Sequence, residues 1–152
     1  MQQNNFLNNA FLHHLSIQCA DPKSLSSFYS ETLGMKSKQI YHQEKTKWLC
    51  FGNDRRIIFS PGKKKNLDFA AFSLKDENSL MNFKNILINN KVSISEYETP
   101  FFMKGSFGVK DPDNNLIIFG ISEINKGIAL SSTYSDHIYG PLQHLTFKSK
   151  DV

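Results

Sequence analysis

The chain has 152 residues, of which 39% are hydrophobic and 21% are charged, a composition typical of one soluble globular domain. Its formal net charge of +4 comes from scattered lysines and arginines, without the basic stripe and interleaved aromatic residues that mark a nucleic-acid-binding surface. The sequence also lacks a signal-peptide pattern and the run of about 20 apolar residues that spans a bilayer, so we expect a cytoplasmic protein with neither nucleic-acid nor membrane partners.

The first part of the chain predicts the order β-α-β-β-β. Residues 13–19 alternate between apolar and polar side chains, as a half-buried strand does. Asp21 and Pro22 are then residue types that begin a helix, and Gly34 is the type that ends one. Three short strands are predicted to follow, at about residues 36–42, 47–52 and 56–60.

The same order of elements recurs in the second part. A strand is predicted at residues 67–74 and a helix at residues 76–89. Further strands are predicted at residues 92–96, 105–110 and 116–121. We therefore predict an α+β fold in which two βαβββ units, residues 11–61 and 67–122, form one cup-shaped mixed sheet with the helices outside.

The end of the chain repeats its beginning. Residues 1–10 are predicted to be a polar tail, and residues 123–141, with weak periodicity, a linker. In residues 142–152 a constant offset matches His144, Leu145 and Asp151 to His14, Leu15 and Asp21. We expect this segment to be the first strand of a second module that is truncated at Val152.

Three stretches carry a family resemblance: HLSIQCADP, then SLSSFYSETLGM, and later DPDNNLI. In this order they resemble the opening strand, first helix and final turn of the vicinal-oxygen-chelate superfamily, which includes glyoxalase I, bleomycin resistance proteins and type I extradiol dioxygenases. The resemblance covers about residues 11–122 and departs from the family's D-P-D-G-N pattern at Asn114. Because the opening motif restarts at Leu142, the chain is most similar to the N-terminal module of a two-module extradiol dioxygenase.

The resemblance places the metal-ligand positions of this first module at His14, Phe69 and Ile118. A site of this type needs two histidines and a carboxylate, so the resemblance implies that this chain holds no metal and that His14 is a relic. In two-module relatives the second module holds iron(II), and His144 would be its first ligand in the full-length protein. The implied activity is ring cleavage of a catechol in aromatic catabolism, for which this chain alone is expected to be inactive.

Strand alternation predicts what lines the cup. If His14 faces inward, Ser16 and Gln18 do so too, and the adjacent His13 faces the other way. We expect an apolar cleft for a small aromatic or apolar molecule to be lined by Trp48, Phe69 and Ile118.

Two other groups of residues have simpler interpretations. Cys19 and Cys50 lie in apolar runs and are predicted to be reduced core thiols. Residues 101–103, with the sequence Phe-Phe-Met, form either a lid over a pocket or an apolar loop packed on a neighbour.

Two other functions stay open on the sequence. One is a stand-alone, metal-free binding module of the bleomycin-resistance type, which would be a homo-oligomer with an apolar cleft. The other is a glyoxalase-like lyase or isomerase with ligands from two chains, which the missing His and Glu disfavour.

Overall fold

Two β-α-β-β-β units follow one another along the chain, as the sequence predicts. The computed structural model describes residues 10–52, 55–63 and 66–123, together with residues 142 and 145. The first unit consists of β1 (Phe11–Cys19), α1 (Pro22–Leu33), β2 (Lys36–His42), β3 (Lys45–Gly52) and β4 (Arg55–Pro61). The second consists of β5 (Asn66–Leu74), α2 (Glu77–Asn89), β6 (Ser95–Glu96), β7 (Phe107–Lys110) and β8 (Leu116–Ile121).

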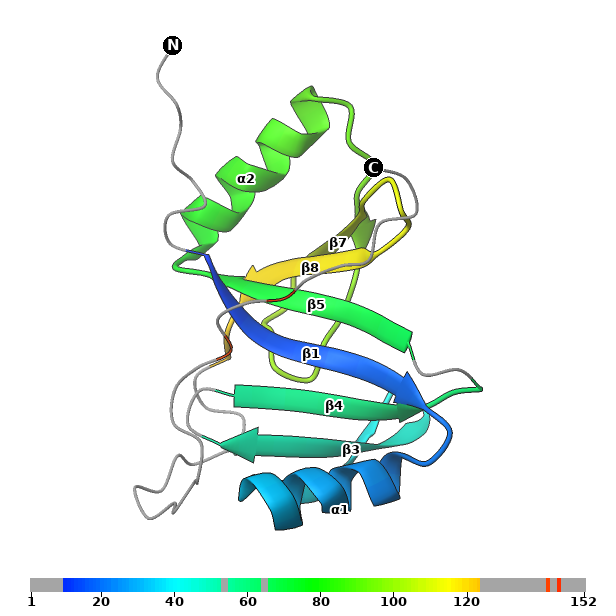
Figure 1. The fold of residues 1–152 in the computed structure, drawn as a ribbon. Coiled ribbons are helices and arrows are strands. Elements are labelled where there is room, and N and C mark those ends of the chain that lie inside the picture. The colour runs from blue at the N-terminus through cyan, green and yellow to red at the C-terminus, as the bar shows by residue number, and fades with distance from the viewer. Residues whose placement is uncertain (1–9, 53–54, 64–65, 124–141, 143–144, 146–152) are drawn as a thin grey trace.

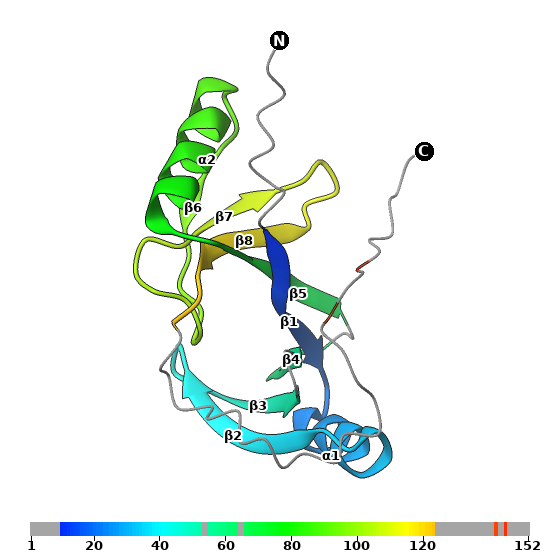
Figure 2. The ribbon, with the colours of Figure 1, turned by 90° about the vertical axis from the view of Figure 1, so that its left-hand side faces the viewer.

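All eight strands join in one mixed sheet with the order β2-β3-β4-β1-β5-β8-β7-β6. The two units meet where β1 runs antiparallel to β5, and each unit contains one parallel pair, β1 with β4 and β5 with β8. The sheet curves into a cup, and the two helices lie on its outer side (Figures 1 and 2). The predicted α+β cup is thus confirmed. In the described part of the chain, neither helix is long and apolar enough to cross a membrane.

The predicted helix caps are present. The Asp21 carboxylate accepts a hydrogen bond from the backbone N–H of Ser24 at 3.0 Å, which satisfies a donor that the first turn leaves unpaired. Gly34 ends α1 in the left-handed conformation, with φ of 70°. The Asp76 carboxylate does the same for the N–H of Ser79 at the start of α2, at 2.8 Å.

Alternating side chains divide the core between the two faces of the sheet. The inner group consists of Leu49, Ile58, Phe69, Ala71, Phe101, Phe102 and Ile118. Under α1 the outer face holds Cys19, Met35, Cys50, Ile57 and Phe59, and under α2 it holds Leu74, Leu80, Phe107 and Phe119. Each fully buried side chain of this size contributes about 1.5–3 kcal/mol. Both cysteines are free and buried, as predicted.

Several strand boundaries differ from the prediction by one to three residues. β3 begins at Lys45 because Gln43 and Glu44 both have positive φ, 52° and 57°, and close a two-residue hairpin without the usual Asn-Gly signal. β6 has only two residues, and β7 begins at Phe107, after Gly105 takes a positive φ. The predicted linker and second-module strand lie almost wholly outside the described residues. Leu142 and Leu145 are described, and neither is in a strand.

The C-terminus of α2 gives a test of backbone strain. Lys91 follows the helix with φ of 59°, while its N–H bonds to the Ile88 carbonyl and the N–H of Val92 bonds to the Leu87 carbonyl. This pattern normally has glycine where Lys91 stands, because a Cβ is unfavourable there. We expect Lys91→Gly to raise the free energy of unfolding by about 1 kcal/mol, measured by urea denaturation. Lys91→Ala removes the same side chain but keeps the Cβ, and an equal gain there would contradict the explanation.

Candidate functional site

Two adjacent histidines occupy the inner face of β1. Leu12 pairs with Phe72 and His14 with Ala71, so His13 is an extra residue in a β-bulge. The rings of His13 and His14 are both buried, and their Nδ1 atoms lie 2.9 Å apart. The expectation that the two side chains face opposite ways is therefore wrong, because the bulge interrupts the alternation on which it rests.

His14 lies in an aromatic pocket formed by three phenylalanines. Its ring centroid is 5.6 Å from that of Phe69 and 5.0 Å from those of Phe101 and Phe102, each in an edge-to-face arrangement. The His14 side chain is fully buried, and its Nε2 has no hydrogen-bond partner among the residues described. The imidazole of His14 is thus enclosed by rings that offer it no acceptor or donor atom.

The two histidines are held uncharged. Burial lowers the pKa of His14 well below its usual value, and the neighbouring His13, Arg56 and His42 lower it further. Burial and then Arg56 lower the pKa of His13 to about 4. A hydrogen bond between the two Nδ1 atoms requires one ring to donate and the other to accept, which fits a pair of neutral imidazoles.

The loop between β6 and β7 closes this end of the cup. It supplies Phe101 and Phe102, and two backbone hydrogen bonds of 2.9 Å fix it to the end of β8. The N–H of Met103 donates to the Ile121 carbonyl, and the N–H of Glu123 donates to the Phe101 carbonyl. A Cβ on Gly120 would lie 2.3 Å from the Phe102 ring, so the close approach depends on glycine there. The sequence predicts either a lid over a pocket or a packed apolar loop at residues 101–103. The structure shows Phe101 and Phe102 as parts of a packed loop.

The structure brings together the three positions that the resemblance assigns to metal ligands. Phe69 and Ile118 belong to one buried cluster, and Phe69 contacts the ring of His14. Neither has a donor atom, so the residues present do not fit an iron(II) site. Within the described ranges no group of three or more His, Cys, Asp or Glu side chains could hold a metal ion. His144 lies outside the described residues.

Trp48 is the exception among the predicted cleft residues. It pairs with Phe59 and packs with Cys50 and Tyr29 under α1, on the outer face of the sheet. Its neighbour Leu49 takes the inward position. The expected cleft of Trp48, Phe69 and Ile118 is corrected accordingly, because two of these side chains lie inside the cup and the third lies outside it.

A polar strip crosses the other half of the inner face. Asp68, at a second irregularity between β1 and β5, accepts hydrogen bonds from Ser16 Oγ at 3.1 Å and Gln18 Nε2 at 3.3 Å. Ser16 and Gln18 thus share the inner face with His14, as expected from alternation. Lys47 on β3 is buried nearby, and burial lowers its pKa while Asp68 opposes that shift. The sequence prediction missed Asp68 and Lys47, although the alternation in β3 would have put Lys47 beside Leu49 on the inner face.

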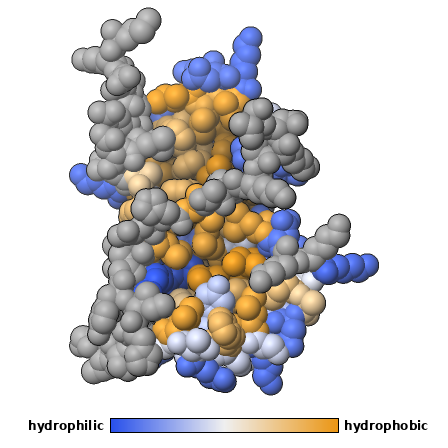
Figure 3. Space-filling view, viewed as in Figure 1, coloured by the Kyte–Doolittle hydropathy of each residue, from blue (hydrophilic) through white to orange (hydrophobic). Residues whose placement is uncertain are grey.

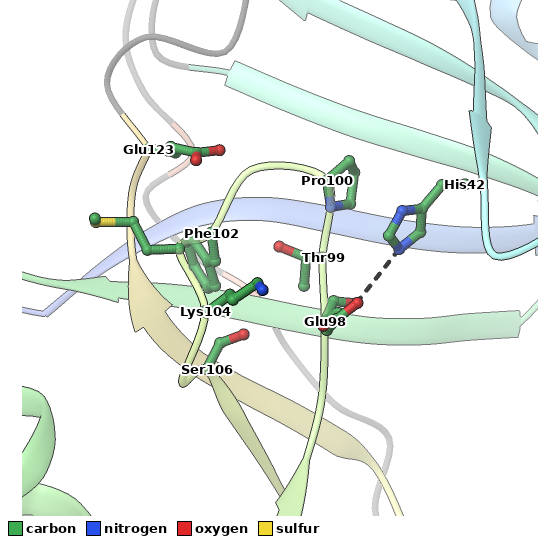
Figure 4. A pocket seen from close by; sticks show the side chains of 9 residues that line it. His42, Glu98, Thr99, Pro100, Phe102, Lys104, Ser106 and Glu123 are labelled. Atoms are coloured by element: carbon green, nitrogen blue, oxygen red, sulfur yellow. Dashed lines mark hydrogen bonds between the residues drawn. The ribbon is translucent and has the colours of Figure 1, made fainter.

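A separate pocket of about 300 Å³ lies at the edge of the cup (Figure 4). His42, at the end of β2, donates from Nε2 to the Glu98 carbonyl at 3.4 Å. The pocket is otherwise lined by Thr99, Pro100, Phe102, Met103, Lys104, Ser106 and Glu123. These residues come from distant parts of the sequence, and no local motif marks them, so the prediction missed this pocket as well.

The cup of two βαβββ units, with its three facing ligand positions, defines the chain as a module of the vicinal-oxygen-chelate type. The family model of the Glyoxalase/Bleomycin resistance protein/Dioxygenase superfamily matches residues 11–119. The chain belongs to this superfamily. No curated protein matches the sequence.

Solved structures with the same fold include three ring-cleaving dioxygenases, each matching 73% of this chain. A catechol 2,3-dioxygenase has a TM-score of 0.60 at 13% identity and is covered over 38% of its length. The 2,3-dioxygenase LapB from Pseudomonas sp. KL28 has a TM-score of 0.62 at 16% identity, with 40% covered. An extradiol ring-cleaving dioxygenase from B. fuscum has a TM-score of 0.59 at 13% identity, with 32% covered. The chain therefore spans less than half the length of these proteins, and at such identities the likeness shows the fold alone.

The buried histidines predict how stability depends on pH. The unfolded chain takes up protons near the ordinary histidine pKa of 6.5, whereas the folded chain resists protonation of His13 down to about pH 4 and holds the pKa of His14 well below 6.5. The free energy of unfolding should therefore fall as the pH drops from 6.5 toward 4, by about 1.4 kcal/mol per pH unit for each histidine. His14→Phe should remove one such contribution, measured by urea denaturation at several pH values. Equal slopes in the two proteins would show that His14 is not held neutral.

Proposed function

We propose that this chain is the metal-free first module of an extradiol, catechol-type ring-cleavage dioxygenase-like protein. The observation that carries the proposal is the closed inner face, where Phe69, Phe101 and Phe102 surround His14 and Ile118 completes the cluster. A substrate that must reach a metal cannot share this space with three packed rings. The module is then a scaffold, and the iron(II) chemistry belongs to a second module.

The repeat supports the second half of this proposal. His144 stands where His14 stands in the first unit, and the chain spans only about a third to two-fifths of the ring-cleaving dioxygenases that share its fold. In the longer protein His144 would be the first iron ligand, with the others supplied by residues beyond Val152. The two free thiols, Cys19 and Cys50, suit the reducing cytoplasm in which we place the protein.

Metal loading tests the proposal directly. After anaerobic loading with iron(II), we expect the purified 152-residue chain to retain no stoichiometric metal and to form no yellow ring-fission product from catechol, because Phe69 and Ile118 offer no donor atom at two of the three ligand positions. Metal content and absorbance are the readouts. Bound iron with turnover would mean that Phe69 and Ile118 are not the ligand positions, or that two chains assemble one site.

The repeat provides a matched pair of variants in the longer protein. His144→Ala should abolish iron binding and turnover, while His14→Phe should leave both unchanged apart from its effect on stability. Loss of iron in the His14 variant alone would show that the metal site lies in the first module and would refute the proposal.

A second candidate is a metal-free binding module of the bleomycin-resistance type, and the pocket in Figure 4 favours it. Its mixture of carboxylates, Lys104 and the apolar side chains of Phe102 and Met103 suits a small amphipathic molecule with an aromatic or apolar part. This function requires a stable homodimer whose melting temperature rises with such a ligand. Light scattering and a thermal-shift screen of aromatic compounds test both, with Lys104→Glu as the variant that should lose the shift. A monomer that responds to no compound would exclude this function.

A further inference from the structure

One part of the outer face of the sheet has no helix over it. α1 packs on β2, β3 and β4, and α2 packs on β5 and β8. The remaining outer cluster, at β1 and the adjoining part of β5, consists of buried Leu12, Leu15 and Ala70 with Leu67 and Phe72 beside them. Helix residues are missing from this cluster in the described part of the chain, although they occur in the other two outer clusters. We call it the β1 outer patch.

The β1 outer patch is nevertheless buried. Leu12 is 6% exposed, Leu15 8% and Ala70 0%, which an uncovered sheet face would not allow. Figure 3 shows hydrophobic side chains gathered on this side of the molecule, between the regions of the two helices. Among the described residues, the side chains that pack on the patch from outside the sheet are Leu142 and Leu145.

The sequence repeat relates the residues on the two sides of this contact. Leu142 and Leu145 occupy in the second copy of the opening motif the positions that Leu12 and Leu15 occupy in the first. The same pair of leucines, three residues apart, therefore stands on both sides of the contact. A surface that packs against its own equivalent is the arrangement expected between two units related by a pseudo-two-fold axis.

We infer that the β1 outer patch is the docking surface for the opening motif of a second module, and that Leu142 and Leu145 of this chain are its occupants. The docking itself stands on the contacts alone, whereas the identity of the occupant as the start of a second module rests on the proposed function. The contact holds the second module behind the sheet, on the side opposite His14. The first cup then contributes neither a ligand nor a wall to the second module's site.

Cysteine cross-linking in the 152-residue chain tests the docking. Single cysteines at position 12 or 15 are combined with single cysteines at position 142 or 145, and each double variant is oxidised or treated with a short bis-maleimide. We expect at least one combination to form a cross-link within one chain, identified by mass spectrometry of the tryptic peptides. Each single variant and the native chain, whose Cys19 and Cys50 are buried, are the controls.

The pattern of cross-links decides between occupants. Products that run as dimers on a non-reducing gel would show that a second copy covers the patch and would overturn the assignment to this chain's own segment. Absence of any cross-link would also contradict the assignment if the variant described next leaves dye binding and amide exchange unchanged.

The double variant Leu142→Asp/Leu145→Asp should uncover the patch. We expect binding of an apolar fluorescent dye to rise about two-fold or more and amide exchange in β1 to accelerate, while Met81→Asp at an exposed position of α2 changes neither. Unchanged dye binding and exchange would overturn the docking. Iron binding through His144 is measured in the longer protein and does not depend on these results. The docking and the proposed function can therefore fail independently.

Discussion

The packing of Phe101 and Phe102 against His13 and His14 is the constraint on which the inner half of the molecule depends. A curved sheet has a concave face that must be filled by side chains or by a ligand, since buried space without atoms is unfavourable. Here the β6–β7 loop fills one end, and the bulge at His13 turns a second imidazole into the same space. The histidines stay neutral because burial among these rings disfavours the charged imidazolium, and Arg56 disfavours it further.

Because aromatic rings fill the inner face, the module keeps the fold of its superfamily without the donor atoms of a complete metal site. The three ligand positions lie on the neighbouring strands β1, β5 and β8 and on the same face of the sheet, but two of them hold side chains without donor atoms. The polar groups of the inner face lie elsewhere, around Asp68, where the hydroxyl of Ser16 and the amide of Gln18 satisfy the carboxylate. These polar atoms bond to one another, whereas the Nε2 of His14 has no partner among the residues described.

The order of elements and the helix caps could be predicted because they depend on local residue types. Asp21, Gly34 and Asp76 act within a few residues of themselves, and the period of apolar side chains located the strands to within a few positions. The errors have non-local causes. Nothing near His13 signals that β5 will pair with a bulge, and the pocket at His42 and Glu98 joins residues from two units. Trp48 is a different case, because the alternation through Leu49 already assigned it to the helix side.

The two edges of the open sheet have a consequence for how copies of this chain meet one another. β2 forms one edge and carries exposed Lys36 and Lys38, while the other edge is β6, only two residues long. Unpaired edge strands invite the addition of further strands and the growth of fibrils, and lysines or a very short strand oppose this. Both edges of the described sheet thus oppose backbone pairing between copies, and this favours contact through the side chains on its faces.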